Sequence, residues 1–437
     1  MKKILIYTHK RTNRVLYIFK HVFGEMLGLD AECIHDKEAF TAYEGPKLNY
    51  SFQPIGDEPF IMADDLLFER GISEQELNFA DYNGQKSFFL TYNKKSIFPF
   101  DLFSASFYLI TRYEEYLPFM KDKYGRFDAE ESLAFSEGFL NKPLINIWAK
   151  DLADKLQSFY PNLEMKLPQF KFISTIDIDA AFAYRQKGML RTAGGYLKDL
   201  RSFNFSEIKK RTGVLLGKES DPFDTFDYQF EIQKKHNLKP IYFILFADYG
   251  TNDKNTPTHS RIFKELVRWI ADHADVGIHP SFTSNSVSGK LEKEIKLLSK
   301  ALHREVSKSR QHFLILNLPN TYRNLINQGI TDDYSLGYAS QIGFRASTCT
   351  SFLFYDLEME NTTSLRLHPF TAMEGSLRDY RQLNARQALE EYQGIIDEVK
   401  AVGGTYISIW HNESLSNQKR WVAWREVYEK MIEYAIS

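Results

Sequence analysis

The chain has 437 residues, of which 43% are hydrophobic, 26% charged and 15% aromatic, and its formal net charge at pH 7 is −2. This composition is typical of a globular protein with two or three domains. The near-zero charge and the absence of a long Lys/Arg run give no reason to expect a nucleic acid or an anionic membrane as partner, and no apolar run approaches the ~20 residues of a membrane span.

The two cysteines, Cys33 and Cys349, have neither the spacing of a metal site nor that of a disulfide framework. The basic start of the chain precedes an apolar run at residues 4–7 that is too short for a signal peptide. We therefore expect a cytoplasmic protein. The sequence leaves its oligomeric state open.

Residues 1–165 predict a small α/β domain. Residues 4–7 have the character of a strand, and residues 13–27 have apolar side chains at helical spacing. A second helical block follows residues 98–102, and a third begins at Pro143 and carries an apolar side chain at every fourth position. No glycine-rich phosphate loop is present, and we see no chemistry of its own in this part.

Residues 168–437 predict a second, larger domain, since Pro161 and Pro168 bracket a short connecting stretch. Strands and amphipathic helices alternate beyond it, which indicates a parallel sheet or a barrel. A basic, glycine-interrupted segment at 185–225 is expected to be an insertion or a lid. The predicted strands are 171–176, 240–246, 275–278, 312–316, 364–367 and 405–410.

Five polar residues follow predicted strands at the point where each strand ends. They are Asp177, Asp179, His279, His368 and His411. In parallel α/β barrels the carboxyl ends of the strands form the catalytic face. A single histidine after a strand is usually structural, but several converging acid–base or metal-binding residues favour a functional site.

Asp177 and Asp179 lie two residues apart, so in a strand their side chains point to the same side. In a pair of carboxylates this close together, one can bind a metal ion while the other acts as a general base. The alternative is a pair of solvated aspartates at the start of a turn.

The stretch Thr175-Ile176-Asp177-Ile178-Asp179 resembles the first motif of the polysaccharide deacetylases, carbohydrate esterase family 4 or the NodB-homology domain. Residues 277–281, beginning at Gly277, resemble the start of its second motif, and residues 409–411 resemble its late motif. The chain as a whole also resembles a bacterial subgroup with an additional N-terminal domain. This similarity implies a distorted (β/α) barrel of the deacetylase type, preceded by the smaller α/β domain.

The resemblance also implies a function, the removal of N-acetyl or O-acetyl groups from a glycan with a divalent metal, most often zinc, in bacterial surface polysaccharide metabolism. It implies these roles: Asp177 as base, His411 as general acid with His368 as its rival, Arg310 holding the base, Asp179 and His279 as metal ligands, and Asp333, Tyr334, Arg345 and Trp410 along the substrate cleft.

The second motif departs from the family pattern, which has a second histidine four residues after the first. Here that position is Thr283, so one metal ligand is missing from the usual three. His312, His368 and the Thr283 hydroxyl are the candidates, and a histidine or an extra water molecule is favoured because a hydroxyl is a poor zinc ligand.

Two other functions stay open. A glycan-binding protein that has lost the catalytic chemistry would explain Thr283. A metal-dependent glycosyltransferase could use Asp177-Ile178-Asp179 to hold a divalent ion against a nucleotide sugar.

Overall fold

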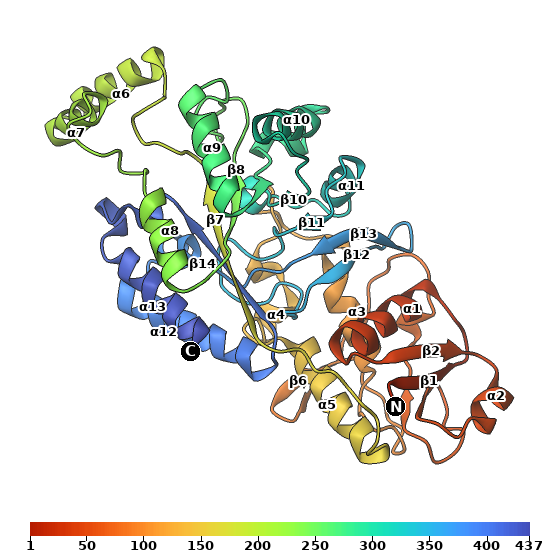
Figure 1. Ribbon diagram of the computed structural model, residues 1–437. Helices are drawn as coiled ribbons and strands as arrows, with labels where there is room; N and C mark the ends of the chain where they lie inside the picture. Colours follow the sequence, from red (N-terminus) through yellow and green to blue (C-terminus); the bar gives the residue numbers. More distant parts are fainter.

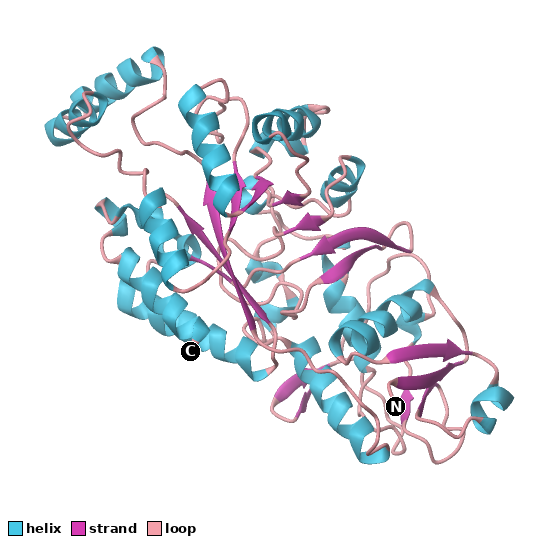
Figure 2. Ribbon diagram, viewed as in Figure 1, coloured by secondary structure: helices cyan, strands magenta, loops and turns pink.

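The computed structural model describes residues 1–437, and it is a mixed α/β structure with two larger sheets and a two-stranded one (Figures 1 and 2). The smaller sheet lies near the N-terminus and the larger one runs through the centre of the molecule. No helix combines the length and the apolar character needed to cross a bilayer.

The N-terminal sheet is parallel throughout, with the strand order β2-β1-β3-β4. Its strands are β1 (Lys3–Thr8), β2 (Asp30–Ile34), β3 (Lys47–Ser51) and β4 (Phe60–Met62), followed by the hairpin β5 (Ala80–Tyr82) and β6 (Gln85–Ser87). The helices here are α1 (Asn13–Phe19), a π-helical turn Lys20–Met26, α2 (Lys37–Ala42), α3 (Leu102–Ile110), α4 (Leu133–Ser136) and α5 (Leu144–Phe159).

The central sheet has nine strands in the order β12-β13-β11-β10-β9-β8-β7-β15-β14. All neighbours are parallel except β12 and β13. The strands are β7 (Lys171–Ile178), β8 (Ile241–Ile244), β9 (Asp275–Ile278), β10 (Lys308–Ser309), β11 (Asp332–Asp333), β12 (Phe352–Asp356), β13 (Asn361–Leu367), β14 (Ala372–Met373) and β15 (Thr405–His411). No strand pairing joins β12 to β14, so the barrel expected from the sequence is not closed.

Amphipathic helices flank this sheet (Figure 1). Ser260 caps α9 by accepting a hydrogen bond from the Phe263 amide at 3.2 Å, and Asn384 begins α12 with a capping box. The helices are α6 (Met189–Arg201), α7 (Phe205–Leu215), α8 (Phe226–Lys235), α9 (Arg261–His273), α10 (Lys290–Leu302), α11 (Asn320–Asn327), α12 (Ala385–Ala401) and α13 (Trp424–Ile436).

The N-terminal part packs tightly against the central sheet. One hydrophobic cluster of 96 buried residues extends from Ile4 on β1 to Trp410 on β15. A buried ion pair crosses the same boundary, with Glu115 accepting two hydrogen bonds from Arg345 at 2.8 and 2.7 Å. Because the two parts share a core, the division at 165/168 stays a prediction.

The predicted strand 312–316 is wrong. The strand at this place is the two-residue β10, and residues 312–314 form a 3₁₀ turn after it. Phe313 and Leu314 have φ values of 60° and 55°, which are incompatible with an extended strand. The apolar character of this stretch comes from burial in the loop, where Leu314 is 5% exposed.

Residues 185–225 do form an insertion after β7. Helices α6 and α7 make a hairpin that projects from the body at the end of the central sheet where β7 terminates (Figure 1).

Candidate metal centre and active-site cavity

The end of β7 carries both aspartates of the first motif. Asp177 is the penultimate residue of the strand, in register with His411 of β15 and Phe243 of β8. Asp179 follows the strand directly. The side chain of Asp177 is only 3% exposed, whereas that of Asp179 is 43% exposed. The two carboxylates therefore have different environments although they share one side of the strand.

His279 follows β9 and is 2% exposed. Its Nδ1 lies 2.5 Å from the carbonyl oxygen of Arg310, so Nδ1 carries the proton and donates it. This leaves Nε2 as an acceptor, 3.3 Å from Oδ1 of Asp179. A carbonyl that fixes the tautomer in this way is the usual outer partner of a metal-binding histidine.

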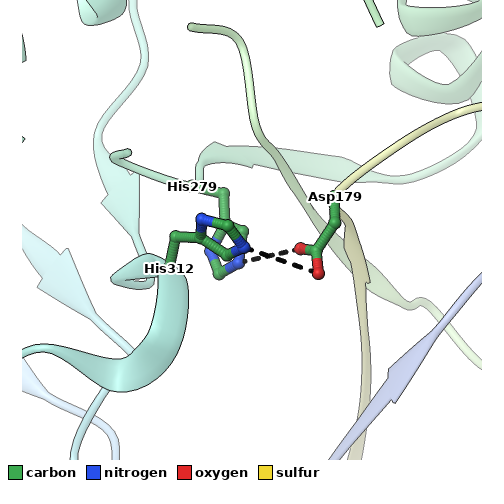
Figure 3. A group of neighbouring side chains, drawn as sticks. All are labelled: Asp179, His279 and His312. Atoms are coloured by element: carbon green, nitrogen blue, oxygen red, sulfur yellow. Dashed lines mark ion pairs between the residues drawn. The ribbon is translucent and has the colours of Figure 1, made fainter. Parts of the chain in front are cut away.

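His312 reaches the same place from the turn after β10 (Figure 3). Its Nε2 lies 3.5 Å from Oδ2 of Asp179, and its Nδ1 lies 2.9 Å from Oδ1 of Asp253. Asp253 is fully buried and also accepts a hydrogen bond from the Phe282 amide at 2.8 Å. Asp253 thus orients the His312 ring from behind.

Asp179, His279 and His312 fit a divalent metal ion. Their ligand atoms all lie within 4.8 Å of one another. Oδ1 of Asp179 is buried without a hydrogen-bond partner, which is costly unless a cation is bound. Two imidazoles and a carboxylate are also a donor set suited to zinc, with one position left for substrate or water.

Thr283 lies outside this cluster, and its hydroxyl accepts a hydrogen bond from Lys290 Nζ. His312 lies where a third ligand is needed, so one of the three candidates from the sequence is favoured by the geometry.

The electrostatics of the cluster match this geometry. Burial acts to raise the pKa of Asp179, but the positive charges of His312 and His411 hold it well below its ordinary value. Burial acts to lower the pKa of His312, yet Asp179 and Asp253 raise it to about 9. The cluster therefore attracts positive charge, which a proton or a metal ion can supply.

Asp177 is held by Arg310, as the resemblance implied. Nη1 of Arg310 donates to Oδ1 of Asp177 at 2.8 Å and to the Thr175 hydroxyl at 2.7 Å. Nε of Arg310 donates to the Tyr334 carbonyl at 2.9 Å, and the guanidinium is fully buried. Oδ2 of Asp177 lies 3.8 Å from Nε2 of His279, so this carboxylate borders the metal cluster.

His411 borders the cluster from β15, with Nε2 4.0 Å from Oδ2 of Asp179. Its Nδ1 lies 2.7 Å from Oε1 of Glu374, a fully buried carboxylate beyond β14. Burial acts to lower the pKa of His411, but Glu374 and the two aspartates raise it to about 10. Glu374 and the two aspartates therefore favour the protonated form of the His411 ring, which faces the cluster.

A cavity of about 250 Å³ opens over these groups. Its floor includes Asp177, Asp179, His279, His312 and His411, and its walls carry the aromatic rings of Phe223, Phe313, Tyr380 and Trp421. Polar groups converging under aromatic walls suit a ligand with both apolar and hydrogen-bonding faces.

The N-terminal part contributes Arg126 to this cavity. Its Nη1 donates to the Phe313 carbonyl at 2.9 Å, and its Nη2 donates to the Tyr380 hydroxyl at 3.0 Å. Arg126 thereby holds the turn that carries His312. The expectation that residues 1–165 carry no chemistry of their own misses this contact.

The structure does not bring His368 to the cluster. Its Nε2 lies 2.7 Å from Asp332 and its Nδ1 lies 2.8 Å from the Ser351 hydroxyl. Its ring stacks on Tyr334 at 4.3 Å between centroids. His368 is occupied in a structural network outside the cavity, which disfavours it as general acid or ligand.

The four expected cleft residues do not line the cavity either. Asp333 is fully buried and accepts hydrogen bonds from the Ser335 amide and hydroxyl, both at 2.9 Å. Tyr334 is 4% exposed and offers Arg310 only its carbonyl. Arg345 is engaged by Glu115. Trp410 has no exposed surface, because it points to the opposite side of β15 from His411, toward Trp424 and Tyr428.

Sequence reasoning missed Asp253, Glu374 and Arg126. Asp253 lies in the loop between β8 and α9, and Glu374 follows a two-residue strand. Neither position follows an apolar run long enough to be recognised as a strand. No signal in the single sequence distinguishes these residues from other charged loop residues.

Residues 4–161 match the model of a family of unknown function, DUF7033. No curated protein matches the chain in sequence. Among solved structures, the chain is similar to a Mycobacterium smegmatis protein assigned to the polysaccharide deacetylases, with 13% identity, 61% of this chain and 84% of that chain covered, and a TM-score of 0.40.

A Pseudomonas aeruginosa PAO1 protein assigned to the same class is similar at 10% identity, over 61% of this chain and 85% of that chain, with a TM-score of 0.39. A CE4 family pseudoenzyme from Bacillus anthracis is similar at 12% identity, over 61% of each chain, with a TM-score of 0.28. Similarity at these identities and TM-scores does not assign a function, which is argued below from the residues of the cavity.

Proposed function

We propose that the cavity is the active site of a metal-dependent hydrolase that removes acetyl groups from N-acetylated sugars of a glycan. The observation that carries this proposal is the convergence of Asp179, His279 and His312 with two flanking groups of opposite character. Asp177 is a carboxylate held by Arg310, and His411 is an imidazolium held by Glu374. Metal-assisted amide hydrolysis uses this combination of a base, an acid and a Lewis acid.

Asp179, His279 and His312 would hold the ion, for which zinc suits the donor set best. When bound, it supplies Lewis-acid polarisation of a carbonyl group and of a water molecule. Asp253 and the Arg310 carbonyl fix the two imidazole rings, so each presents Nε2 without rotating.

The chain's own residues then perform the proton transfers. Asp177 accepts a proton from the attacking water as the water oxygen bonds to the amide carbon. Arg310 keeps this carboxylate aimed at the cluster through the 2.8 Å hydrogen bond. His411 delivers a proton to the leaving nitrogen as the carbon–nitrogen bond breaks, which releases acetate and an amine.

The aromatic walls support a sugar as substrate. Phe223 and Trp421 lie at one side of the cavity and Tyr380 is among its other lining groups. Aromatic faces bind the apolar faces of sugar rings, and Arg420 and Asn412 add polar groups beside them. A glycan of bacterial surface polysaccharide metabolism and a reducing, cytoplasmic location belong to the same proposal. Cys33 and Cys349 are both free thiols, which is compatible with that location.

The glycosyltransferase alternative has less support. A transferase of that kind needs the Asp-x-Asp carboxylates to face the cation and the diphosphate. Asp177 is almost completely buried and its Oδ1 is paired with Arg310, so Asp179 is the more accessible carboxylate of the two. Two histidines on the remaining sides complete a hydrolase-type ligand set.

The test is acetate release from N-acetylated oligosaccharides by the full chain loaded with zinc or cobalt. Asp177→Asn should lower the rate by about 10²–10⁴-fold while the metal content stays that of the wild type. Asp248→Asn, which alters an exposed carboxylate paired with Lys293, is the matched control and should behave as wild type. A metal-loaded protein that binds glycans without releasing acetate would refute the hydrolase and favour a binding role.

A further inference from the structure

The α6–α7 hairpin exposes an unusual amount of apolar surface. Eight of the 23 exposed large hydrophobic side chains in the molecule lie within residues 189–216. Leu190, Met189 and Phe203 are 90%, 89% and 80% exposed. Scattered exposed hydrophobics are normal, but a contiguous group marks an interaction surface.

The apolar side chains of α6 form one stripe. Met189, Leu197 and Leu200 recur at helical spacing, and Leu190 lies beside them. Helix α7 lies against an adjoining side of α6, where Tyr196 and Thr212 share a hydrogen bond at 2.8 Å and Asp199 pairs with Arg211 at 2.7 Å. The exposed stripe has no partner within the chain.

The hairpin is basic, in contrast to the net charge of −2 of the whole chain. Residues 189–216 contain six Lys or Arg and two acidic residues, a net charge of +4. Both acidic residues are used internally. Asp199 pairs with Arg211 at 2.7 Å, and Glu207 pairs with Lys419 at 2.9 Å.

The outward-facing cations are free. Lys198, Arg201, Lys209 and Lys218 are exposed and make no ion pair. Lys198 and Arg201 lie next to Leu197 and Leu200 on α6, so positive charges border the apolar stripe. A helix with an apolar stripe bordered by cations is suited to the interface of an anionic bilayer.

The hairpin is fixed to the body beside the cavity. Tyr184 and Glu207 at its base share a hydrogen bond, and they line a depression together with Phe223 and Trp421. Phe223 and Trp421 also line the candidate active-site cavity. A surface that binds the hairpin would therefore lie close to the cavity entrance.

We propose that the α6–α7 hairpin docks on an anionic membrane surface, with the apolar stripe inserted among the lipids and the free cations at the headgroups. The helices are 13 and 11 residues long, too short to span the ~20 residues of a bilayer, so they lie in the interface. The occupant is anionic lipid rather than nucleic acid, because nucleic acid would leave the leucine stripe in water. This inference is independent of the proposed function.

The test uses the full chain and sedimentation with vesicles of phosphatidylcholine, alone or with about 30% phosphatidylglycerol. We expect binding to the anionic vesicles that weakens at high salt. Leu190→Ser/Leu197→Ser/Leu200→Ser and, separately, Lys198→Glu/Arg201→Glu should each weaken it at least about tenfold. Met120→Ser/Met359→Ser removes two side chains that are 75% and 69% exposed elsewhere, and it should bind as wild type.

Each side chain changed is exposed, so unaltered thermal melting should confirm that the variants are folded. Wild-type protein that remains in solution with anionic vesicles, or a leucine variant that binds like wild type, overturns the proposal. A wild-type dimer that the leucine variant converts to a monomer, with no vesicle binding, would show instead that the stripe is an interface between two copies.

Discussion

Glu374 has no exposed surface, and its Oε1 lies 2.7 Å from Nδ1 of His411 and accepts the His411 backbone N–H at 2.9 Å. A buried carboxylate with these two contacts both orients the ring and keeps it positively charged. His411 is thereby matched to the role of an acid that protonates a leaving amine.

Glu374→Gln should shift the pH dependence of acetate release. A general acid works only when protonated, so activity is lost as the pH rises through the pKa of His411, about 10 in the wild type. Without the Glu374 charge, burial is the larger remaining influence and lowers that pKa. The loss of kcat should then begin at least about one pH unit lower.

The pH profile of kcat for the two proteins measures this shift, with the exposed Glu390→Gln on α12 as the control. A variant whose rate falls equally at every pH would indicate that Glu374 only holds the ring in place. That result would contradict the electrostatic part of its role.

His312, rather than Thr283, should be required for metal binding. His312→Ala removes a ligand from the cluster and should leave little bound zinc after dialysis, whereas Thr283→Ala should retain it. Asp253→Asn keeps the ring but weakens its outer hydrogen bond, so zinc affinity should fall by about 10–100-fold.

Metal content per chain and a chelator competition titration distinguish the three variants. Equal metal content in wild type and His312→Ala would show that the third ligand comes from elsewhere. Chelation of the wild-type metal should also abolish acetate release, and readdition of zinc should restore it.

How much of the site the sequence predicts depends on strand length. Asp177, Asp179 and His411 lie at the carboxyl ends of the long strands β7 and β15, and the strand-end rule places them together. His279 was found by the same rule because β9 ends one residue before it. The mixed α/β class with parallel strands and the major helices were predictable for the same reason, since their apolar periodicity is long, whereas the expected closed barrel is not present.

His312 illustrates where this reasoning ends. Its strand, β10, has two residues, and the left-handed turn at Phe313 and Leu314 that aims the ring cannot be read from residue types. The prediction that Trp410 lines the cleft is wrong although its strand was predicted. Side chains alternate along a strand, so Trp410, next to His411, points away from the cavity toward the helices.

His368→Ala should leave acetate release unchanged, because His368 lies outside the cavity. It should lower the free energy of unfolding by about 1–2 kcal/mol, since Asp332 and Ser351 lose their hydrogen-bond partner. Denaturant titration and the acetate assay together test this. A large loss of kcat with normal stability would return His368 to the list of catalytic candidates.

Glu25→Gln should destabilise the protein at neutral pH but not in acid. Glu25, on the π-helical turn of the N-terminal part, accepts hydrogen bonds from Arg366 of β13 at 3.1 and 3.3 Å, and Nδ1 of His21 lies 3.3 Å away. Burial acts to raise the pKa of Glu25, but these partners lower it from 4.5 to about 2.

A carboxylate with a depressed pKa contributes stability above its unfolded pKa, and that contribution is lost as the pH falls toward the folded value. The shift corresponds to about 3 kcal/mol in full, and partial exposure of the pair reduces this to about 1–2 kcal/mol at pH 7. Urea midpoints of wild type and variant should therefore converge between pH 4.5 and about 2.

Glu32→Gln, which alters an exposed pair with Lys3, should have little effect at either pH. A difference between wild type and Glu25→Gln that stays constant down to the acid limit would mean that Arg366 stabilises the contact between the two parts of the chain through packing, and not through the charge of Glu25.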